Sequence, residues 1–202
     1  MIDQKFVDLY AHGAKVPLLV AERDVVLTYV LRILADVGLL PQLAFKGGTC
    51  IRKIYFGRTA RFSEDLDFTV LTDIEPEELI LQVAGAFDGK SYYDITFSVG
   101  MPDFYVREDR RACGARVAYA HAWNPAAKFD LDLSLRERPI LTPQLRDLHV
   151  ERYFERLGII PPTVICLCLE EIIAEKIRAT YQRRRARDVF DLFRFQQQPF
   201  DR

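Results

Sequence analysis

The chain has 202 residues, 50% of them apolar, and a formal net charge of −1. These values are those of an ordinary globular protein, with one large domain or a domain plus a helical appendage, and the charge gives no overall sign of a nucleic-acid partner. No run reaches the roughly 18 uncharged apolar residues of a membrane span, and the N-terminus lacks the layout of a signal peptide, so we expect a cytoplasmic protein.

The first predicted element is an amphipathic helix over residues 18–37, where apolar positions recur at helical spacing and Gly38 and Pro41 follow. A short apolar run at 43–45 predicts a strand, which leads through KGGT at 46–49 to a second helical pattern at 50–56. Glycines between a strand and a helix let the backbone approach a ligand, and a helix N-terminus favours an anion such as phosphate. By itself, such a pair of glycines more often makes only a tight turn.

Residues 61–70, RFSEDLDFTV, predict a second strand with an unusual charge pattern. Alternate side chains of a strand share a face, so Asp65, Asp67 and Thr69 project one way and the apolar residues project the other way. Two carboxylates this close repel each other unless a cation lies between them, and oxygen ligands suit magnesium. The other interpretation is that both acids only face solvent.

Residues 72–87 predict a helix with Pro76 near its start, and residues 92–100, 112–123 and 128–135 predict strands, with turn residues such as Asn124 before the last. This last strand repeats the charge pattern, because Asp130, Asp132 and Ser134 share one face. If the two acidic strands are neighbours, they supply the third carboxylate that a two-metal site uses. The sequence leaves open whether this is Asp132 or, second in preference, Asp130.

Residues 164–195 are predicted to be helical. Lys176 interrupts the apolar stripe of the first helix in this segment. Either its aliphatic stem packs on the core and its ammonium group extends to water, or the ammonium group faces an anion. Asp188 and Asp191 lie three residues apart on one helical face and could simply pair with nearby arginines. The four cysteines are scattered and fit neither a zinc site nor a redox pair, so we expect buried thiols.

The order of elements predicts an α/β fold with a mixed sheet and a helical C-terminal part. We divide the chain into a core with an N-terminal helix at 1–140 and a helical part at 141–202 that completes the active site, although both could form one continuous domain.

The glycine turn, the DxD strand and the later acidic strand together resemble the nucleotidyltransferase superfamily, whose fold is of the polymerase beta type. Within it, KGGT at 46–49 and RFSEDLDF at 61–68 are similar to the AbiEii/AbiGii toxin family, which includes the MenT toxins. The family's lysine and its R-x-x-D-x-x-D-like element match Lys176, Asp188 and Asp191. The resemblance extends from about residue 44 to 192.

The resemblance implies an active site with Mg²⁺ on the carboxylates and the nucleotide phosphates on the glycine turn and on lysine. The implied catalytic residues are Asp65, Asp67, Lys176, Asp132 and Asp188. The expected metal ligands are Asp65, Asp67, Asp132 and Asp130. The expected nucleotide-binding residues are Lys46, Gly47, Gly48, Thr49, Arg61, Ser63 and Lys176, of which Ser63 and Thr49 are also possible phosphorylation sites.

By the same resemblance, the protein is a toxin of a toxin–antitoxin system that transfers NMP from an NTP to the 3′ end of tRNA and blocks translation. Its partners would be the NTP, tRNA and a cognate antitoxin. A cluster of arginines would contact RNA phosphates, namely Arg183, Arg184, Arg185 and Arg187. Two alternatives stay open, which are NMP transfer to a protein hydroxyl and a module that binds nucleotide or antitoxin without catalysis.

Overall fold

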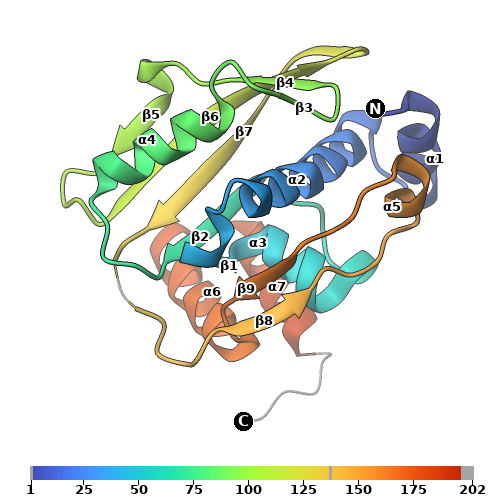
Figure 1. Cartoon of the computed structure of the whole chain (residues 1–202). Coiled ribbons are helices and arrows are strands. Elements are labelled where there is room, and N and C mark those ends of the chain that lie inside the picture. Colours follow the sequence, from blue (N-terminus) through green and yellow to red (C-terminus); the bar gives the residue numbers. More distant parts are fainter. Residues whose placement is uncertain (1, 137, 197–202) are drawn as a thin grey trace.

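A mixed sheet runs through the molecule in the computed structural model, which describes residues 2–136 and 138–196 (Figure 1). The strands are β1 (Leu43–Lys46), β2 (Asp65–Val70), β3 (Ser91–Tyr92), β4 (Ile95–Ser98), β5 (Phe104–Val106), β6 (Ala112–His121), β7 (Asn124–Ser134), β8 (Gln144–Asp147) and β9 (Thr163–Cys166). Across the described residues the order is β3-β4-β6-β7-β2-β1-β9-β8, and β5 pairs with β6 at the side of this path. The pairs β2–β7 and β1–β9 are parallel, and the remaining pairs are antiparallel.

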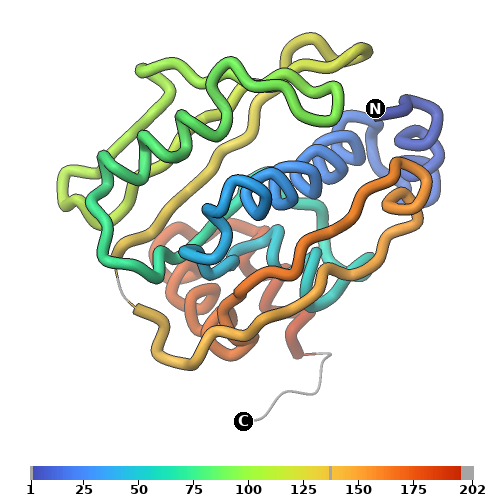
Figure 2. The backbone as a smooth tube through the Cα atoms, viewed as in Figure 1, coloured from blue at the N-terminus to red at the C-terminus, as the bar shows by residue number. Residues whose placement is uncertain are grey.

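Helices cover both faces of this sheet (Figures 1 and 2). They are α1 (Gln4–Ala14), α2 (Leu18–Asp36), α3 (Gly47–Cys50), α4 (Pro76–Phe87), α5 (Arg152–Leu157), α6 (Leu169–Arg183) and α7 (Ala186–Phe195). Helix α3 continues as a π-helical segment, Ile51–Phe56. Helices α2 and α4 lie on one face of the sheet, and α6 and α7 lie on the other. Among the described residues no helix is long and apolar enough to cross a membrane.

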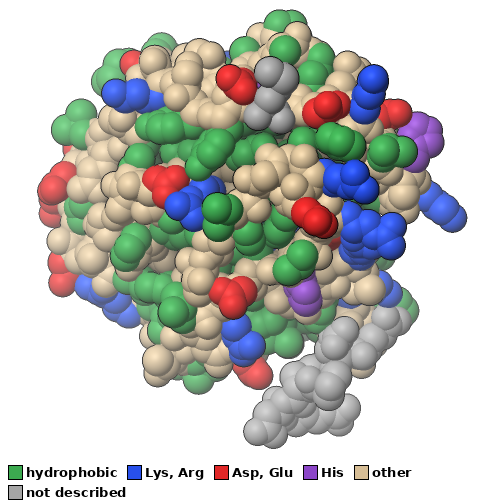
Figure 3. Space-filling model, turned by 45° about the vertical axis from the view of Figure 1, so that its right-hand side comes forward, with side chains coloured by type: hydrophobic (Ala, Val, Ile, Leu, Met, Phe, Trp, Pro, Cys, Tyr) green, Lys and Arg blue, Asp and Glu red, His purple; other side chains and the backbone are tan. Residues whose placement is uncertain are grey.

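The core lies between the sheet and the α2–α4 layer. Leu66 and Phe68 of β2 are fully buried, as is Phe87 of α4, whose ring lies 5.4 Å from that of Phe97 in β4. The apolar alternation of β2 and β7 therefore faces α2 and α4, and the acidic alternation faces α3 and α6. The outer surface seen in Figure 3 mixes acidic and basic side chains, as the small net charge predicts.

The main predicted elements are confirmed, with differences at their ends. The predicted helix at 18–37 is α2, and it ends before Gly38, whose φ is +77°. Asn124, expected in a turn, is the first residue of β7, because it pairs with His121 to close the hairpin. The predicted C-terminal helix begins only at Leu169, since residues 163–166 form β9 between β1 and β8. The segment 141–202 therefore adds two strands to the core sheet and is not purely helical.

Candidate active site

The two acidic strands are direct neighbours, although 65 positions separate them in the chain (130 minus 65). Strands β2 and β7 pair in parallel, so Asp65 is level with Asp130, and Asp67 is level with Asp132. Side chains at such paired positions project to the same face. The pairing therefore combines both acidic faces into one ladder of carboxylates, which Thr69 and Ser134 continue as the next level.

A cleft of about 280 Å³ lies over the middle of this ladder. Asp67 and Asp132 line its floor, and Lys46 and Gly47 line the wall that comes from β1 and the glycine turn. Helix α6 closes the opposite side with residues that include Lys176 and Arg183. Residues from four distant parts of the sequence thus meet around two carboxylates, and we call this space the catalytic cleft.

The glycine turn packs directly against the carboxylate ladder. Gly47 has φ +75°, and a Cβ atom there would lie 2.0 Å from Asp67 Oδ2. A Cβ atom on Gly48 would lie 2.7 Å from Ser63 Oγ and 2.8 Å from Arg61 Nη2. Real Cβ contacts do not come this close, and positive φ disfavours any L side chain. The turn therefore requires glycine, Gly47 because Asp67 lies beside it and Gly48 because Ser63 and Arg61 do.

Two hydroxyl groups expected at the phosphate site lie behind the turn. The Thr49 hydroxyl donates a hydrogen bond to the Asp65 carbonyl, and its side chain is buried. Ser63 is buried against Gly48. Neither residue lines the catalytic cleft, and the Thr49 hydroxyl links the glycine turn to the start of β2.

The central carboxylates repel each other. Burial raises the pKa of Asp67 to about 6, and the charges of Asp132 and Asp65 add to the effect. Burial and nearby carboxylates also raise the pKa of Asp65. Arg187 offers Asp65 only partial compensation, because Nη1 lies 3.9 Å from Oδ2. The ladder is therefore a concentration of negative charge that a bound cation would relieve.

The two acids of β7 differ in their surroundings. Asp130 is half-buried, does not line the catalytic cleft and accepts hydrogen bonds from Arg116 at 2.7 and 3.3 Å. Asp132 lines the catalytic cleft and accepts a hydrogen bond from the hydroxyl of Tyr105 in β5. The Tyr105 ring passes over Gly114, where a Cβ atom would lie 2.7 Å from it. Sequence reasoning missed Tyr105, and Gly114 within an apolar strand was the available signal for a close approach.

Lys176 lies at the centre of a buried chain of alternating charges. Its Nζ lies 3.1 Å from Asp188 Oδ1 and 2.9 Å from Asp191 Oδ2. Two arginines complete the chain of charges. Arg61 donates two hydrogen bonds of 3.0 Å to Asp191, and Arg183 donates hydrogen bonds of 2.8 and 2.9 Å to Asp188. Burial would raise the pKa of Asp188, but the hydrogen bonds from Arg183 and Lys176 lower it to about 2.

This chain of charges joins the loop before β2 to α6 and α7. Asp188 and Asp191 are almost completely buried and do not line the cleft, whereas Lys176 does. The two aspartates thus hold the lysine at the cleft wall. Arg61 is held by Asp191 beside Gly48, also outside the cleft lining.

The remaining arginines of the predicted RNA-binding cluster surround the end of α6. Arg184 and Arg185 are exposed in the link between α6 and α7. Arg187 is directed toward Asp65, and Arg183 toward Asp188. Three of the four, Arg183, Arg184 and Arg185, are therefore exposed, and Arg183 and Arg187 are directed toward acidic groups of the site.

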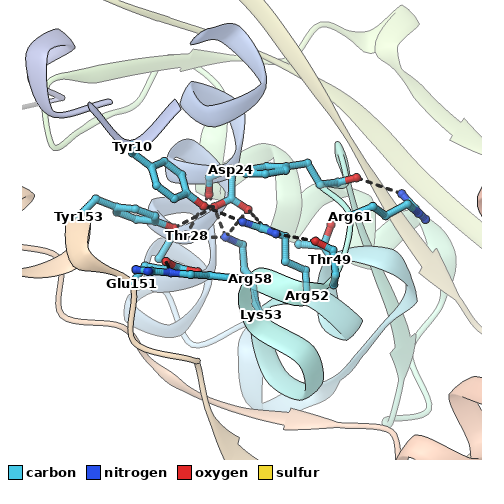
Figure 4. Close-up of polar contacts among 12 residues, drawn as sticks. Tyr10, Asp24, Thr28, Thr49, Arg52, Lys53, Arg58, Arg61, Glu151 and Tyr153 are labelled. Carbon is cyan, nitrogen blue, oxygen red and sulfur yellow. Dashed lines mark hydrogen bonds and ion pairs between the residues drawn. The ribbon is translucent and has the colours of Figure 1, made fainter. Parts of the chain in front are cut away.

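A second buried polar cluster anchors the helix that follows the glycine turn (Figure 4). Asp24 of α2 pairs with Arg52 at 3.2 Å and with Lys53 at 3.1 Å, and both cations come from the π-helical segment. Tyr10 and Tyr153 donate hydrogen bonds to the same carboxylate at 2.9 and 3.1 Å. These contacts hold the π-helical segment against the cluster formed with α1, α2 and α5. They therefore fix the position of the chain that directly follows the glycine turn. Sequence reasoning did not identify this cluster, because its members carry no recognisable spacing.

The donor set suits a divalent metal, although no group of three acidic, histidine or cysteine side chains within residues 2–136 and 138–196 is already arranged to hold one. Asp67 and Asp132 supply oxygen ligands at the cleft floor, and Asp65 is the next acid along β2. Burial, with the neighbouring charges of Asp132 and Asp65, raises the pKa of Asp67, so a bound cation would favour its ionised form. Hard cations such as Mg²⁺ prefer these ligands and keep part of their water shell.

Comparison with known proteins identifies the family and a similar fold. The family model described as nucleotidyl transferase AbiEii toxin, type IV TA system, matches residues 29–202. The solved structure of MenT4, a nucleotidyltransferase toxin from Mycobacterium tuberculosis H37Rv, is similar with a TM-score of 0.83 and 25% sequence identity. That likeness covers 100% of this chain and 66% of the MenT4 chain, so this chain spans slightly less than two thirds of its neighbour. No protein with curated annotation matches the sequence.

Proposed function

Because the chain belongs to the AbiEii family of nucleotidyl transferase toxins of type IV toxin–antitoxin systems, we propose that it transfers NMP from an NTP to an RNA. The acceptor is the 3′ end of tRNA, and the modified tRNA no longer supports translation. The reaction takes place in the cytoplasm, where both substrates occur, and a cognate antitoxin counters it. The observation that carries the proposal is the in-register pairing of Asp67 with Asp132 on the floor of a cleft lined by lysines.

Asp65, Asp67 and Asp132 are the proposed ligands of Mg²⁺. A bound divalent metal supplies charge neutralisation at the phosphoryl group that is transferred. Asp132 is preferred to Asp130 because Asp132 lines the catalytic cleft, whereas Asp130 does not line it and is paired with Arg116. Tyr105 orients the Asp132 carboxylate through its hydroxyl.

The lysines of the cleft bind the triphosphate. Lys176 reaches the cleft wall with its ammonium group held by Asp188 and Asp191, and Lys46 reaches it from β1. A phosphate placed over Gly47 can come close to the backbone because no side chain occupies that position. Asp188 acts on the reaction through Lys176, as a positioning residue.

Arg184 and Arg185 are the proposed contacts to the RNA backbone. They are exposed at the end of α6, next to Arg183 of the cleft wall. Contacts between arginine and phosphate release counterions, so transfer to tRNA is expected to weaken steeply as salt rises. Replacing both arginines with glutamine is expected to raise the KM for tRNA and to leave NTP binding unchanged.

Transfer of label tests the proposal. The purified protein is incubated with each α-labelled NTP, Mg²⁺ and either total tRNA or cell lysate. We expect label in tRNA, at the 3′ end, and none in the presence of EDTA. Label in protein would support transfer to a protein hydroxyl, and no transfer with any NTP would support a module without catalysis.

Asp132 and Asp130 provide a matched pair of variants for the same assay. Asp132→Asn is expected to lower transfer at least 1000-fold (on the order of the loss of one essential ligand), and Asp130→Asn to retain most of it. Equal loss in both variants would refute the assignment of Asp132 as the third ligand.

A further inference from the structure

A second cleft continues the catalytic cleft along the same face of the sheet. Its volume is about 210 Å³, and we call it the distal cleft. It lies over Thr69 and Ser134, the pair that follows Asp67 and Asp132 on the strand ladder. We infer that the distal cleft binds a nucleobase, either that of the NTP or that of the terminal nucleotide of the acceptor. The inference rests on the proposed function for the phosphate side of the site.

The two clefts form one groove. Both are lined by Lys46, Ser134 and Glu175, together with two arginines of the β7 end and α6, Arg136 and Arg178. Lys46 and Glu175 form an ion pair of 2.8 Å at the boundary. Two residues along a strand span about 7 Å, so the distal cleft begins one such step from the central carboxylates. A ligand whose phosphates lie at the carboxylates can therefore extend its next group into the distal cleft.

The walls of the distal cleft suit a flat ring with polar edges. Pro139, Ile140 and Ala174 supply apolar surface, on which the face of a base can stack. Thr69 and Ser134 supply hydroxyl groups from the floor, and neither hydroxyl has a hydrogen-bond partner within the described part of the chain. A hydroxyl can both donate and accept, so it can pair with either kind of atom on the edge of a base.

The glycine turn and the proposed metal ligands assign the phosphates to the catalytic cleft, because neither Gly47 nor Asp67 and Asp132 line the distal cleft. The distal cleft carries both acidic and basic side chains, Glu171 and Glu175 beside Arg136, Arg138 and Arg178, which suit the polar edge of a base. Glu171 also accepts hydrogen bonds from the backbone N–H groups of Ile140 and Leu141 at 3.0 and 3.3 Å, which fixes it at the rim. The catalytic cleft, with Lys46, Lys176 and Arg183 around Gly47, is the better place for phosphates.

Binding measurements on the whole chain test the inference. Ala174 is exposed on α6 and lines the distal cleft only, so Ala174→Phe fills that cleft. Ile177→Phe is the control, because Ile177 is exposed on the same helix and lines neither cleft. Titration calorimetry in Mg²⁺ compares each of the four NTPs with inorganic tripolyphosphate, which lacks a base. We expect the wild type and Ile177→Phe to bind at least one NTP about 10-fold more tightly than tripolyphosphate, and Ala174→Phe to lose that preference.

A second arm identifies the source of the base. Total tRNA is compared with tRNA whose 3′-terminal nucleotide is abasic. If Ala174→Phe abolishes a preference for the intact 3′ end and leaves NTP binding unchanged, the base belongs to the acceptor, and the inference holds in that form. Thr69→Val, which removes only a hydroxyl, should weaken the same base-dependent preference about 3- to 10-fold, the effect of one lost hydrogen bond.

The inference is overturned if Ala174→Phe and Thr69→Val change neither preference. These readouts are independent of transfer, so they separate the two proposals. A base-dependent preference that the variants abolish, in a protein that transfers no label, would refute the proposed function and support the distal cleft. Label transfer with unchanged preferences in both variants would do the opposite.

Discussion

Replacing Asp188 tests whether the buried chain of charges around Lys176 stabilises the fold. Asp188→Asn keeps the size of the side chain and removes its charge, which Lys176 and Arg183 neutralise in the wild type. The pKa of Asp188 is lowered to about 2, against about 3.9 in an unfolded chain, because those two hydrogen-bonded cations outweigh its burial. This difference corresponds to about 2 to 3 kcal/mol of the free energy of unfolding at neutral pH.

The sign of the pH dependence follows from the lowered pKa. Between about pH 4 and pH 2 the unfolded chain binds a proton that the folded chain does not, so acid favours unfolding. The contribution of Asp188 is complete above about pH 4 and is lost as the pH falls toward 2. The difference between wild type and Asp188→Asn should therefore be largest at pH 5 to 7, at about 2 to 3 kcal/mol, and should shrink below about pH 4.

Urea unfolding, followed by circular dichroism between pH 7 and pH 3, measures this difference. Asp8→Asn is the control, because Asp8 is exposed on α1 and, within the described residues, its one ion pair is the loose contact with His12 at 3.6 Å. The control should change the free energy of unfolding by less than about 0.5 kcal/mol at every pH. A difference for Asp188→Asn as small as that of the control, or one that does not vary with pH, would refute the reasoning.

Three further predictions concern the catalytic cleft. Burial and neighbouring carboxylates raise the pKa of Asp67 to about 6, so a proton competes with the metal for this carboxylate. The Mg²⁺ concentration for half-maximal transfer should therefore rise roughly 10-fold per pH unit below pH 6. A constant Mg²⁺ requirement from pH 7 to 5 would contradict this prediction. Tyr105→Phe removes the hydrogen bond to Asp132 and should lower kcat roughly 10-fold. The free energy of unfolding should change by less than about 1 kcal/mol. An unchanged kcat would show that the Tyr105 hydroxyl does not orient the Asp132 carboxylate. Gly47→Ala places a Cβ atom 2.0 Å from Asp67 Oδ2 and should destabilise the fold by about 2 to 4 kcal/mol. Gly85→Ala is the control, because nothing lies within 4 Å of a Cβ atom there, and it should not destabilise the fold. Equal melting temperatures for the two variants would argue against close packing of Gly47 on Asp67.

Much of the site could be predicted from local patterns. The alternation of acidic and apolar residues in β2 and β7 gave the face of each aspartate, because strand periodicity depends only on the neighbouring residues. Whether β2 and β7 are neighbours depends on the order of all strands in the sheet. The sequence patterns of the two strands therefore could not predict their pairing. The structure shows the pairing and its register.

The roles of single side chains were harder to predict, because they depend on contacts between distant residues. The place of Thr49 beside the phosphate stays a prediction, and the structure adds that its hydroxyl donates to the Asp65 carbonyl, a group 16 positions away. The place of Arg61 at the triphosphate also stays a prediction, and its contact with Asp191, 130 positions away, could not be read from a local pattern. Tyr105 was not selected because β5 itself was not predicted, being a strand of only three residues.

The residues that line the catalytic cleft are spread along the chain from Lys46 to Arg183, so the cleft forms late during synthesis. A ribosome delivers the chain from its N-terminus, and β2 is made long before β7 and α6. Until α6 has left the ribosome, its lysine cannot lie opposite the glycine turn and the paired carboxylates. A nascent chain therefore has no complete catalytic cleft before residue 183 has emerged.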